Sequence, residues 1–256
     1  MAKPQLCIIM LIYLFSNHII ENKKGIIMQK KYLLWDFDNT LAYRDGMWGQ
    51  TIYFLLQEYG YHSVELEDIK THLITGFPWH TPEISHEEFF GGIQWWDYMT
   101  LHFSKIIHEF GINEILSTEI ASQIKMKYLD ITKWHLYDDT IPCLERAIDE
   151  SYENIIVSNH VPELSHLVRD LRISKYFSQV YSSAHLGYEK PNLQIYRRVL
   201  DKLEDTSDVT MIGDSYTADV EGARNAGIKA ILVRKENIHN YQNYCKGLDE
   251  IYNILL

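Results

Sequence analysis

Short apolar runs followed by polar residues recur along this chain from residue 32 onward. Most of these runs are continuously hydrophobic rather than alternating, which is typical of strands buried on both faces of a parallel sheet. The pattern therefore predicts strands over residues 32–35, 154–157, 179–182, 208–212 and 229–233.

Helical periodicity replaces this pattern between residues 43 and 139, where apolar residues recur at steps of three and four. A first helix is predicted from Trp48 to Tyr59, and Gly60 ends it. Further helices are predicted over residues 65–74, 86–110 and 117–133, the last because Ser117 begins it with Glu119 in its first turn. This stretch predicts an inserted helical bundle.

Helices also alternate with the later strands. The spacing of apolar residues predicts them over residues 143–152, 162–171 and 192–203, and an amphipathic helix ends the chain. The expected fold class is therefore α/β, with a parallel-sheet core formed by residues 28–42 and 140–256 and a helical domain over residues 43–139.

Two carboxylates follow the first predicted strand directly. Asp36 and Asp38 are two residues apart, so in an extended segment their side chains lie on one side, and Thr40 follows two residues later. Two like charges this close are costly unless a cation or a shared proton lies between them. A solvated turn is the simpler interpretation of an isolated Asp-x-Asp, but its position after an apolar strand favours a site.

Polar residues follow or lie near the later strands as well. Because ligands bind beyond the carboxyl ends of the strands in open α/β sheets, we expect these side chains to converge on the two aspartates. They are Ser158, Asn159, Lys190, Gly213, Asp214, Ser215 and Asp219.

Composition and charge narrow the possible partners. The 256 residues are 46% hydrophobic, which is enough for a substantial core, and the net charge of −11 with no basic run argues against a nucleic-acid polymer as partner. Cys7, Cys143 and Cys245 show neither metal nor redox spacing, so we expect no disulfide and a cytoplasmic location.

The first 27 residues require a separate interpretation. The apolar run from Leu6 to Phe15 resembles the core of a signal peptide, but it has no clear cleavage site and is short for a membrane span, so no stable membrane association is expected. Residues 23–28 can be encoded by a purine-rich stretch followed by ATG, as at a bacterial ribosome-binding site. On this hypothesis the native chain begins at Met28, and residues 1–27 are a non-native or disordered extension.

The set of motifs resembles the haloacid dehalogenase (HAD) superfamily of phosphohydrolases. Its four motifs match Asp36-Phe37-Asp38-Asn39-Thr40, Ser158-Asn159, Lys190, and Gly213-Asp214 with Asp219, in the expected order. The resemblance implies a Rossmann-like core with an inserted helical C1 cap. It also implies Mg²⁺-dependent hydrolysis of a small phosphorylated metabolite through an aspartyl-phosphate.

The resemblance assigns a role to each motif residue. Asp36 would be the nucleophile, Asp38 the acid and base, and Lys190 a cation at the reacting phosphoryl group. Phosphate would be held by Ser158 and Asn159, with Thr40, and Mg²⁺ by Asp36, Asp38 and Asp214. Asp219 and Ser215 would hold these residues in position without being in the first layer around the substrate.

The predicted cap contains candidates for recognising the substrate. Trp79 stands between Pro78 and Pro82 in a segment rich in helix-breaking residues, where packing in a core is difficult, whereas burial is the expectation for Trp95 and Trp96. If the bundle closes over the site, then Arg44, Trp79, His80 and His86 are candidates for touching the substrate, although a solvated position is the simpler interpretation of Arg44 and the two histidines.

Three other functions remain open from the sequence. A dehalogenase of the same superfamily lacks the second aspartate, so Asp38 argues against it. A sugar phosphomutase retains both aspartates and is separated from a phosphatase only by its product. A catalytically silent binding module is the alternative from another class, although every catalytic position is filled. The sequence leaves the oligomeric state and the physiological substrate undetermined.

Overall fold

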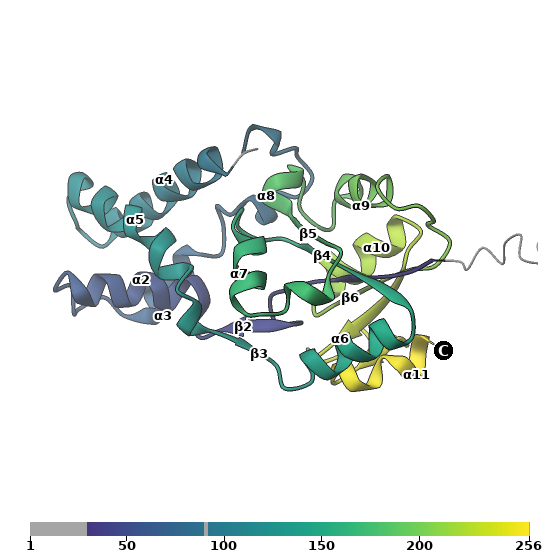
Figure 1. The fold of residues 1–256 in the computed structure, drawn as a ribbon. Helices are drawn as coiled ribbons and strands as arrows, with labels where there is room; N and C mark the ends of the chain where they lie inside the picture. Colours follow the sequence, from purple (N-terminus) through teal and green to yellow (C-terminus); the bar gives the residue numbers. More distant parts are fainter. Residues whose placement is uncertain (1–29, 90–91, 256) are drawn as a thin grey trace, which may run out of the picture.

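A six-stranded parallel sheet forms the centre of the computed structural model, which describes residues 30–89 and 92–255. β1 (Lys31–Trp35) lies in the middle and pairs with β4 on one side and β6 on the other (Figure 1). The strand order is β5-β4-β1-β6-β7-β8, where the other strands are β4 (Tyr152–Ser158), β5 (Gln179–Ser182), β6 (Val209–Gly213), β7 (Lys229–Val233) and β8 (Tyr244–Cys245). This order confirms the predicted Rossmann-like α/β core.

Alternate residues of β1 enter two separate hydrophobic cores. Leu33 and Trp35 pack on the face covered by α6 (Thr140–Asp149), α7 (Leu164–Asp170) and the C-terminal turns η6 (Leu248–Glu250) and α11 (Tyr252–Leu255). Tyr32 and Leu34 pack on the opposite face, covered by α8 (Ser183–Leu186), α9 (Leu193–Leu200), the π-helical turn η5 (Tyr216–Glu221) and α10 (Gly222–Asn225). Because both faces are covered, β1 is buried from Tyr32 to its end and carries no charged residue after Lys31.

Four helices form a bundle beside the carboxyl ends of the strands (Figure 1): α2 (Met47–Glu58), α3 (Leu66–His72), α4 (Ile93–Glu109) and α5 (Glu114–Tyr128). Trp95 and Trp96 are buried in it, as predicted. Short 3₁₀ turns, η1 (Pro78–His80) and η2 (Glu87–Phe89), lie between α3 and α4.

The bundle joins the sheet through features that the periodicity did not predict. An antiparallel ribbon of β2 (Ala42–Arg44) and β3 (Trp134–Leu136) carries the chain out and back, with η3 (Ile131–Lys133) preceding β3. Each strand of the ribbon has three residues, which is too short to show an alternating pattern. The two-residue strand β8 was missed for the same reason.

Two predicted helix boundaries in the bundle were wrong. α5 begins at Glu114 rather than Ser117, because the Asn113 side chain accepts a hydrogen bond from Leu116 N at 3.0 Å. Ser117 is buried and instead donates to the carbonyl of Ile112. The predicted helix over residues 86–110 is interrupted, with η2 preceding Gly92 and α4 following it.

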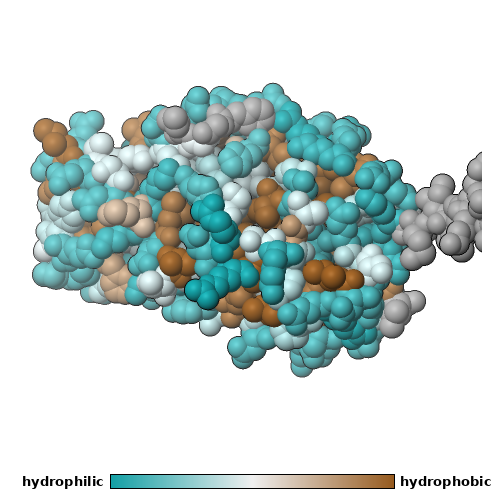
Figure 2. Space-filling model, in the orientation of Figure 1, coloured by the Kyte–Doolittle hydropathy of each residue, from teal (hydrophilic) through white to brown (hydrophobic). Residues whose placement is uncertain are grey.

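The predictions for residues 1–27, including Cys7 and a start at Met28, lie outside the described residues. Among the residues that are described, none of the helices combines the length and apolarity needed to cross a bilayer. Hydrophilic residues dominate the face shown in Figure 2, where the hydrophobic ones form separate groups. Cys143 and Cys245 are buried free thiols.

Candidate active site

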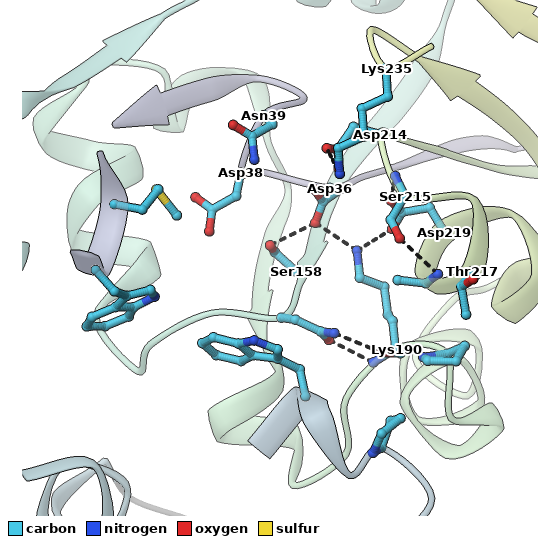
Figure 3. Close-up of a pocket in the computed structure, with 17 residues that line it drawn as sticks. Asp36, Asp38, Asn39, Ser158, Lys190, Asp214, Ser215, Thr217, Asp219 and Lys235 are labelled. Atoms are coloured by element: carbon cyan, nitrogen blue, oxygen red, sulfur yellow. Dashed lines mark hydrogen bonds and ion pairs between the residues drawn. The ribbon is translucent and has the colours of Figure 1, made fainter. Parts of the chain in front are cut away.

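Most of the residues predicted from the motifs line one cavity of about 500 Å³ beyond the carboxyl ends of β1, β4 and β6 (Figure 3). Asp36 is the first residue after β1, and its N–H donates to Ile212 O at 2.9 Å, which extends the sheet by one step. Phe37 turns into the core with no exposed surface, whereas Asp36 and Asp38 both line the cavity. The alternation predicted for this segment is therefore confirmed.

The Asp36 carboxylate is buried and contacted by three side chains. Ser158 Oγ donates to Oδ1 at 2.8 Å, and Lys190 Nζ contacts the same oxygen at 2.7 Å. Thr40 is fully buried and does not line the cavity, but its hydroxyl donates to Asp36 Oδ2 at 3.4 Å. Ser158 and Lys190, which follow Asp36 by 122 and 154 residues, thus fix one oxygen of this carboxylate.

Lys190 lies between two carboxylates, with Nζ 2.5 Å from Asp219 Oδ1 as well as 2.7 Å from Asp36. Burial alone would lower the pKa of Lys190, but the carboxylates of Asp219 and Asp36 outweigh burial and raise it, so the ammonium stays charged. Burial raises the pKa of Asp219; the Lys190 ammonium lowers it, and the nearby Asp36 carboxylate raises it again. One ammonium is therefore shared by two buried acids.

Asn159 holds the Lys190 loop in place. Its side-chain carbonyl accepts from Lys190 N at 2.7 Å, and its amide donates to Lys190 O at 2.8 Å. Asn159 lines the cavity, but both ends of its amide are engaged with the main chain of Lys190. These contacts give Asn159 a part in positioning the lysine, which the prediction of phosphate binding did not include.

Gly213 allows Asp219 to approach the end of β6. A Cβ atom at Gly213 would overlap the Asp219 carboxylate, so the turn between β6 and η5 requires a glycine here. Ser215 N donates to Asp219 Oδ2 at 2.9 Å, and Ser215 Oγ accepts from Ala218 N at the start of η5. Ser215 therefore helps to hold the Asp219 carboxylate in position.

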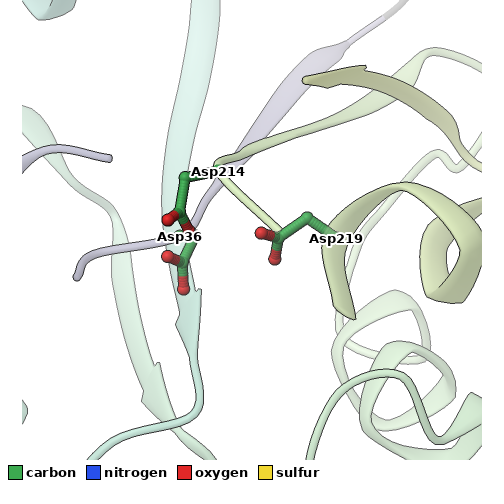
Figure 4. A group of neighbouring side chains, drawn as sticks. All are labelled: Asp36, Asp214 and Asp219. Atoms are coloured by element: carbon green, nitrogen blue, oxygen red, sulfur yellow. The ribbon is translucent and has the colours of Figure 1, made fainter. Parts of the chain in front are cut away.

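Three carboxylates form a group that could hold a cation (Figure 4). Asp36, Asp214 and Asp219 each offer an oxygen, and these oxygens lie within 4.8 Å of one another. All three residues are buried, and burial together with the Asp36 and Asp219 charges raises the pKa of Asp214. An all-oxygen donor set with excess negative charge suits a hard divalent cation such as Mg²⁺. The residues present thus fit the metal that the resemblance implies.

Two residues of the site escaped the sequence prediction. Lys235 Nζ is 2.7 Å from Asp214 Oδ2, and His160 Nε2 is 3.5 Å from Asp38 Oδ1. Lys235 comes two residues after β7, so the rule that picked out Asp36 and Asp214 could have found it. His160 likewise comes two residues after β4, so the same rule could have found it, although its ring is buried among Phe37, Tyr128 and Trp134.

The candidates for substrate contact divide into two groups. Trp79 is half-buried and lines the cavity. Arg44, His80 and His86 are not among its lining residues. Arg44 is buried because its guanidinium donates to the main-chain carbonyls of Lys127 and Tyr128, and His86 Nδ1 lies 2.6 Å from Glu189 Oε2. Arg44 and His86 are therefore buried and paired elsewhere. They neither line the cavity, as contact with the substrate would require, nor lie in solvent, which was the alternative.

Comparisons with known proteins identify related chains. Glyceraldehyde 3-phosphate phosphatase of Methanothermobacter thermautotrophicus is 33% identical over 103 residues, which are 39% of this chain and 45% of that relative. Pyrimidine 5'-nucleotidase PynA of Streptococcus pneumoniae is 24% identical over 214 residues, 82% of this chain and 86% of its own length.

A solved structure and a family match agree with these relatives. The HAD-hydrolase YfnB of Bacillus subtilis, solved bound to magnesium, superposes with a TM-score of 0.67 at 20% identity, covering 89% of this chain and 99% of that one. The family match, to haloacid dehalogenase-like hydrolase, spans residues 30–227. This chain therefore belongs to the haloacid dehalogenase-like hydrolase family.

Proposed function

We propose that this protein is a Mg²⁺-dependent phosphomonoester hydrolase that works through an aspartyl-phosphate on Asp36. The main support is the environment of the Asp36 carboxylate. Ser158 and Lys190 hold this carboxylate in a cavity that Asp38 also lines. Two relatives named as a phosphatase and a nucleotidase support the same class of reaction.

A phosphoryl group is anionic, so the site must neutralise charge before a carboxylate can approach it. Ser158 and Lys190 would hold the phosphoryl oxygens, because both donate to Asp36 Oδ1 and therefore lie beside the nucleophile that the phosphorus must approach. Mg²⁺ would be held by Asp36, Asp214 and the main-chain carbonyl of Asp38, because Lys190 and Ser215 N already engage the two oxygens of Asp219. It would supply further positive charge to the phosphoryl oxygens.

The protein's own acids would carry the two chemical steps. An oxygen of Asp36 forms a bond to phosphorus as the bond to the leaving oxygen breaks, and Asp38 gives that oxygen its proton. Asp38 then takes a proton from water as the water oxygen attacks phosphorus, which frees Asp36 and inorganic phosphate. Asp38 is suited to move a proton because its carboxylate is half-buried at the cavity wall.

The helical bundle would act as the cap of this site and residues 43–139 as a separate domain. Met47 and Trp48 at the start of α2 line the same cavity as the catalytic acids, which supports a role in covering the substrate. The substrate would be a small phosphorylated metabolite, since the cavity of about 500 Å³ is of the size that holds single small molecules.

The test measures inorganic phosphate released from p-nitrophenyl phosphate with Mg²⁺, with excess chelator, and in Asp36→Asn. We expect turnover only in the first case, and Asp149→Asn, an exposed acid on α6, is the matched control that keeps it. Activity retained in Asp36→Asn would refute the mechanism. Isomerised sugar phosphate without release of phosphate would identify a phosphomutase, and metal-independent loss of halide from a haloacid would identify a dehalogenase. A folded chain without any turnover would favour the binding module.

A further inference from the structure

The cavity has two chemically different halves. The half described above carries the acids and lysines that face the phosphoryl group. We define the other half, where the leaving group would lie, as the lining residues supplied by the bundle and by the segment after α3, together with Asn39: these are Asn39, Met47, Trp48, Trp79 and Pro82. None of these five residues is charged. The side chains that meet the leaving group are therefore aromatic, apolar or amide groups.

Among the described residues that line the cavity, every lysine or arginine is already paired with a carboxylate. The only lysines or arginines among them are Lys190 and Lys235, and each contacts a catalytic carboxylate at 2.7 Å. The guanidinium of Arg44 donates to main-chain carbonyls instead. Partial burial lowers the pKa of His80, which favours its neutral form. A second anionic group on the substrate would therefore have to compete with a carboxylate of the site for its positive partner, in a chain of net charge −11.

Trp79 offers a flat surface that is already fixed in place. One face of its indole stacks on the buried Phe77, with ring centroids 4.6 Å apart and planes inclined by 16°. The indole is only half-buried, so part of it remains open toward the cavity. A pre-positioned aromatic ring binds another ring with little loss of conformational entropy.

The segment that carries Trp79 is hydrogen-bonded to the loop that carries Lys190. Asn192 Nδ2 donates to Pro82 O at 2.7 Å, and His86 N donates to Gly187 O at 2.8 Å. The buried pair of His86 and Glu189 adds a contact of 2.6 Å. These bonds set the distance between the indole and the phosphoryl site, so the leaving group must span a defined gap.

We propose that the substrate is a phosphomonoester whose leaving group carries a planar, uncharged aromatic ring that stacks on Trp79. Nucleoside 5'-monophosphates are the class of metabolite that fits, since they join one phosphoryl group to an uncharged base through a neutral sugar. The inference rests on the proposed hydrolase activity.

The experiment compares kcat/KM for substrates that differ in one feature. Uridine 5'-monophosphate has the base, ribose 5-phosphate lacks it, and 2-phosphoglycolate replaces it with a second anion. We expect the nucleotide to be preferred over ribose 5-phosphate by about tenfold or more, mainly through KM, which corresponds to the usual strength of one base stacked on an aromatic ring. The 2-phosphoglycolate should be the poorest substrate.

Substitutions then test the stacking on Trp79 and the lack of a positive charge in the second half separately. Trp79→Ala should reduce the ratio of the nucleotide to ribose 5-phosphate by roughly five- to a hundredfold, and Trp79→Phe should restore most of it. Phe54→Ala, which removes a 53% exposed ring from α2, is the matched control and should leave the ratio unchanged. Met47→Lys places an ammonium in the second half and should raise the ratio of 2-phosphoglycolate to the nucleotide by about tenfold.

The outcomes separate this inference from the activity on which it rests. Equal use of the nucleotide and ribose 5-phosphate by the unaltered protein would overturn the inference and leave the hydrolase intact. A loss in Trp79→Ala that is the same for every substrate would also overturn it, because the ring would then have only a structural role. Absence of phosphate release from all substrates, p-nitrophenyl phosphate included, would overturn the proposed function and the inference with it.

Discussion

Replacing Lys190 with methionine tests how the buried acids of the site are stabilised. The Lys190 ammonium contacts Asp36 at 2.7 Å and Asp219 at 2.5 Å, and its side chain is 1% exposed. Methionine retains most of the side-chain volume and removes the charge. The change therefore leaves two buried carboxylates without the cation they share.

The expected loss of stability is large. Removing one partner from a buried ion pair costs about 3–5 kcal/mol because the remaining charge is buried and uncompensated. Here two acids lose the same partner, so the upper half of that range is expected. For a chain of this size each kcal/mol lowers the thermal midpoint by about 2–4 °C, which predicts a fall of roughly 8–20 °C.

The size of the loss should depend on pH in the metal-free protein. The pKa of Asp219 is raised chiefly by burial, and removing the opposing ammonium raises it further. A carboxyl with a raised pKa binds a proton in the folded chain that the unfolded chain releases, so its stability contribution is complete at low pH and is lost as pH rises through the folded value. Lys190→Met should therefore lose less stability at pH 5 than at pH 8.

The assay is chemical denaturation in excess chelator at these two pH values. Adding Asp219→Asn to Lys190→Met should restore part of the lost free energy, since a neutral amide replaces one uncompensated charge. Lys229→Met is the control, because it breaks an exposed pair with Asp208 and should cost no more than about 1 kcal/mol. A loss for Lys190→Met no larger than that control, or one independent of pH, would refute this account of the site.

Three further changes probe other contacts of the fold. Gly213→Ala should abolish phosphate release while the chain still folds, because the new methyl group displaces the Asp219 carboxylate; normal turnover would contradict this. His86→Ala should destabilise by about 2–4 kcal/mol in urea denaturation by leaving a buried carboxylate unpaired, and Glu189→Gln in the same chain should recover part of the loss; purely additive effects would argue against the pair. Burial raises the pKa of Cys143 to about 12, so unfolding free energy should fall as pH rises above about 9, and Cys143→Ala should flatten that slope; identical slopes would count against it.

Much of the site could be predicted because it follows from the geometry of parallel strands. Asp36, Ser158 and Asp214 each lie at or just beyond the carboxyl end of a strand, and such ends meet at one edge of the sheet. The strands themselves were predictable because burial on both faces leaves a continuous apolar run. Asp219, to which the resemblance assigned a supporting role, contacts Lys190 near that edge.

The contacts that escaped prediction join residues with no common pattern. The guanidinium of Arg44 donates to the carbonyls of Lys127 and Tyr128, 83 and 84 residues later. Every residue has a main-chain carbonyl, so the sequence does not indicate which one accepts. The pair of His86 and Glu189 spans 103 residues. The start of α5 was misplaced because Asn113 and Ser117 are both suitable N-caps, and only the burial of Ser117 decides between them.

The same loop therefore serves chemistry and recognition. Glu189 and Asn192 flank Lys190, and their side chains bind His86 and the carbonyl of Pro82 on the segment that carries Trp79. On the other side, the main chain of Lys190 is bound by Asn159. A displacement of the segment after α3 would strain contacts on both sides of the lysine. If the proposed stacking on Trp79 is correct, a leaving group that fits the indole would thus be placed at a distance from Asp36 that the Lys190 loop itself sets.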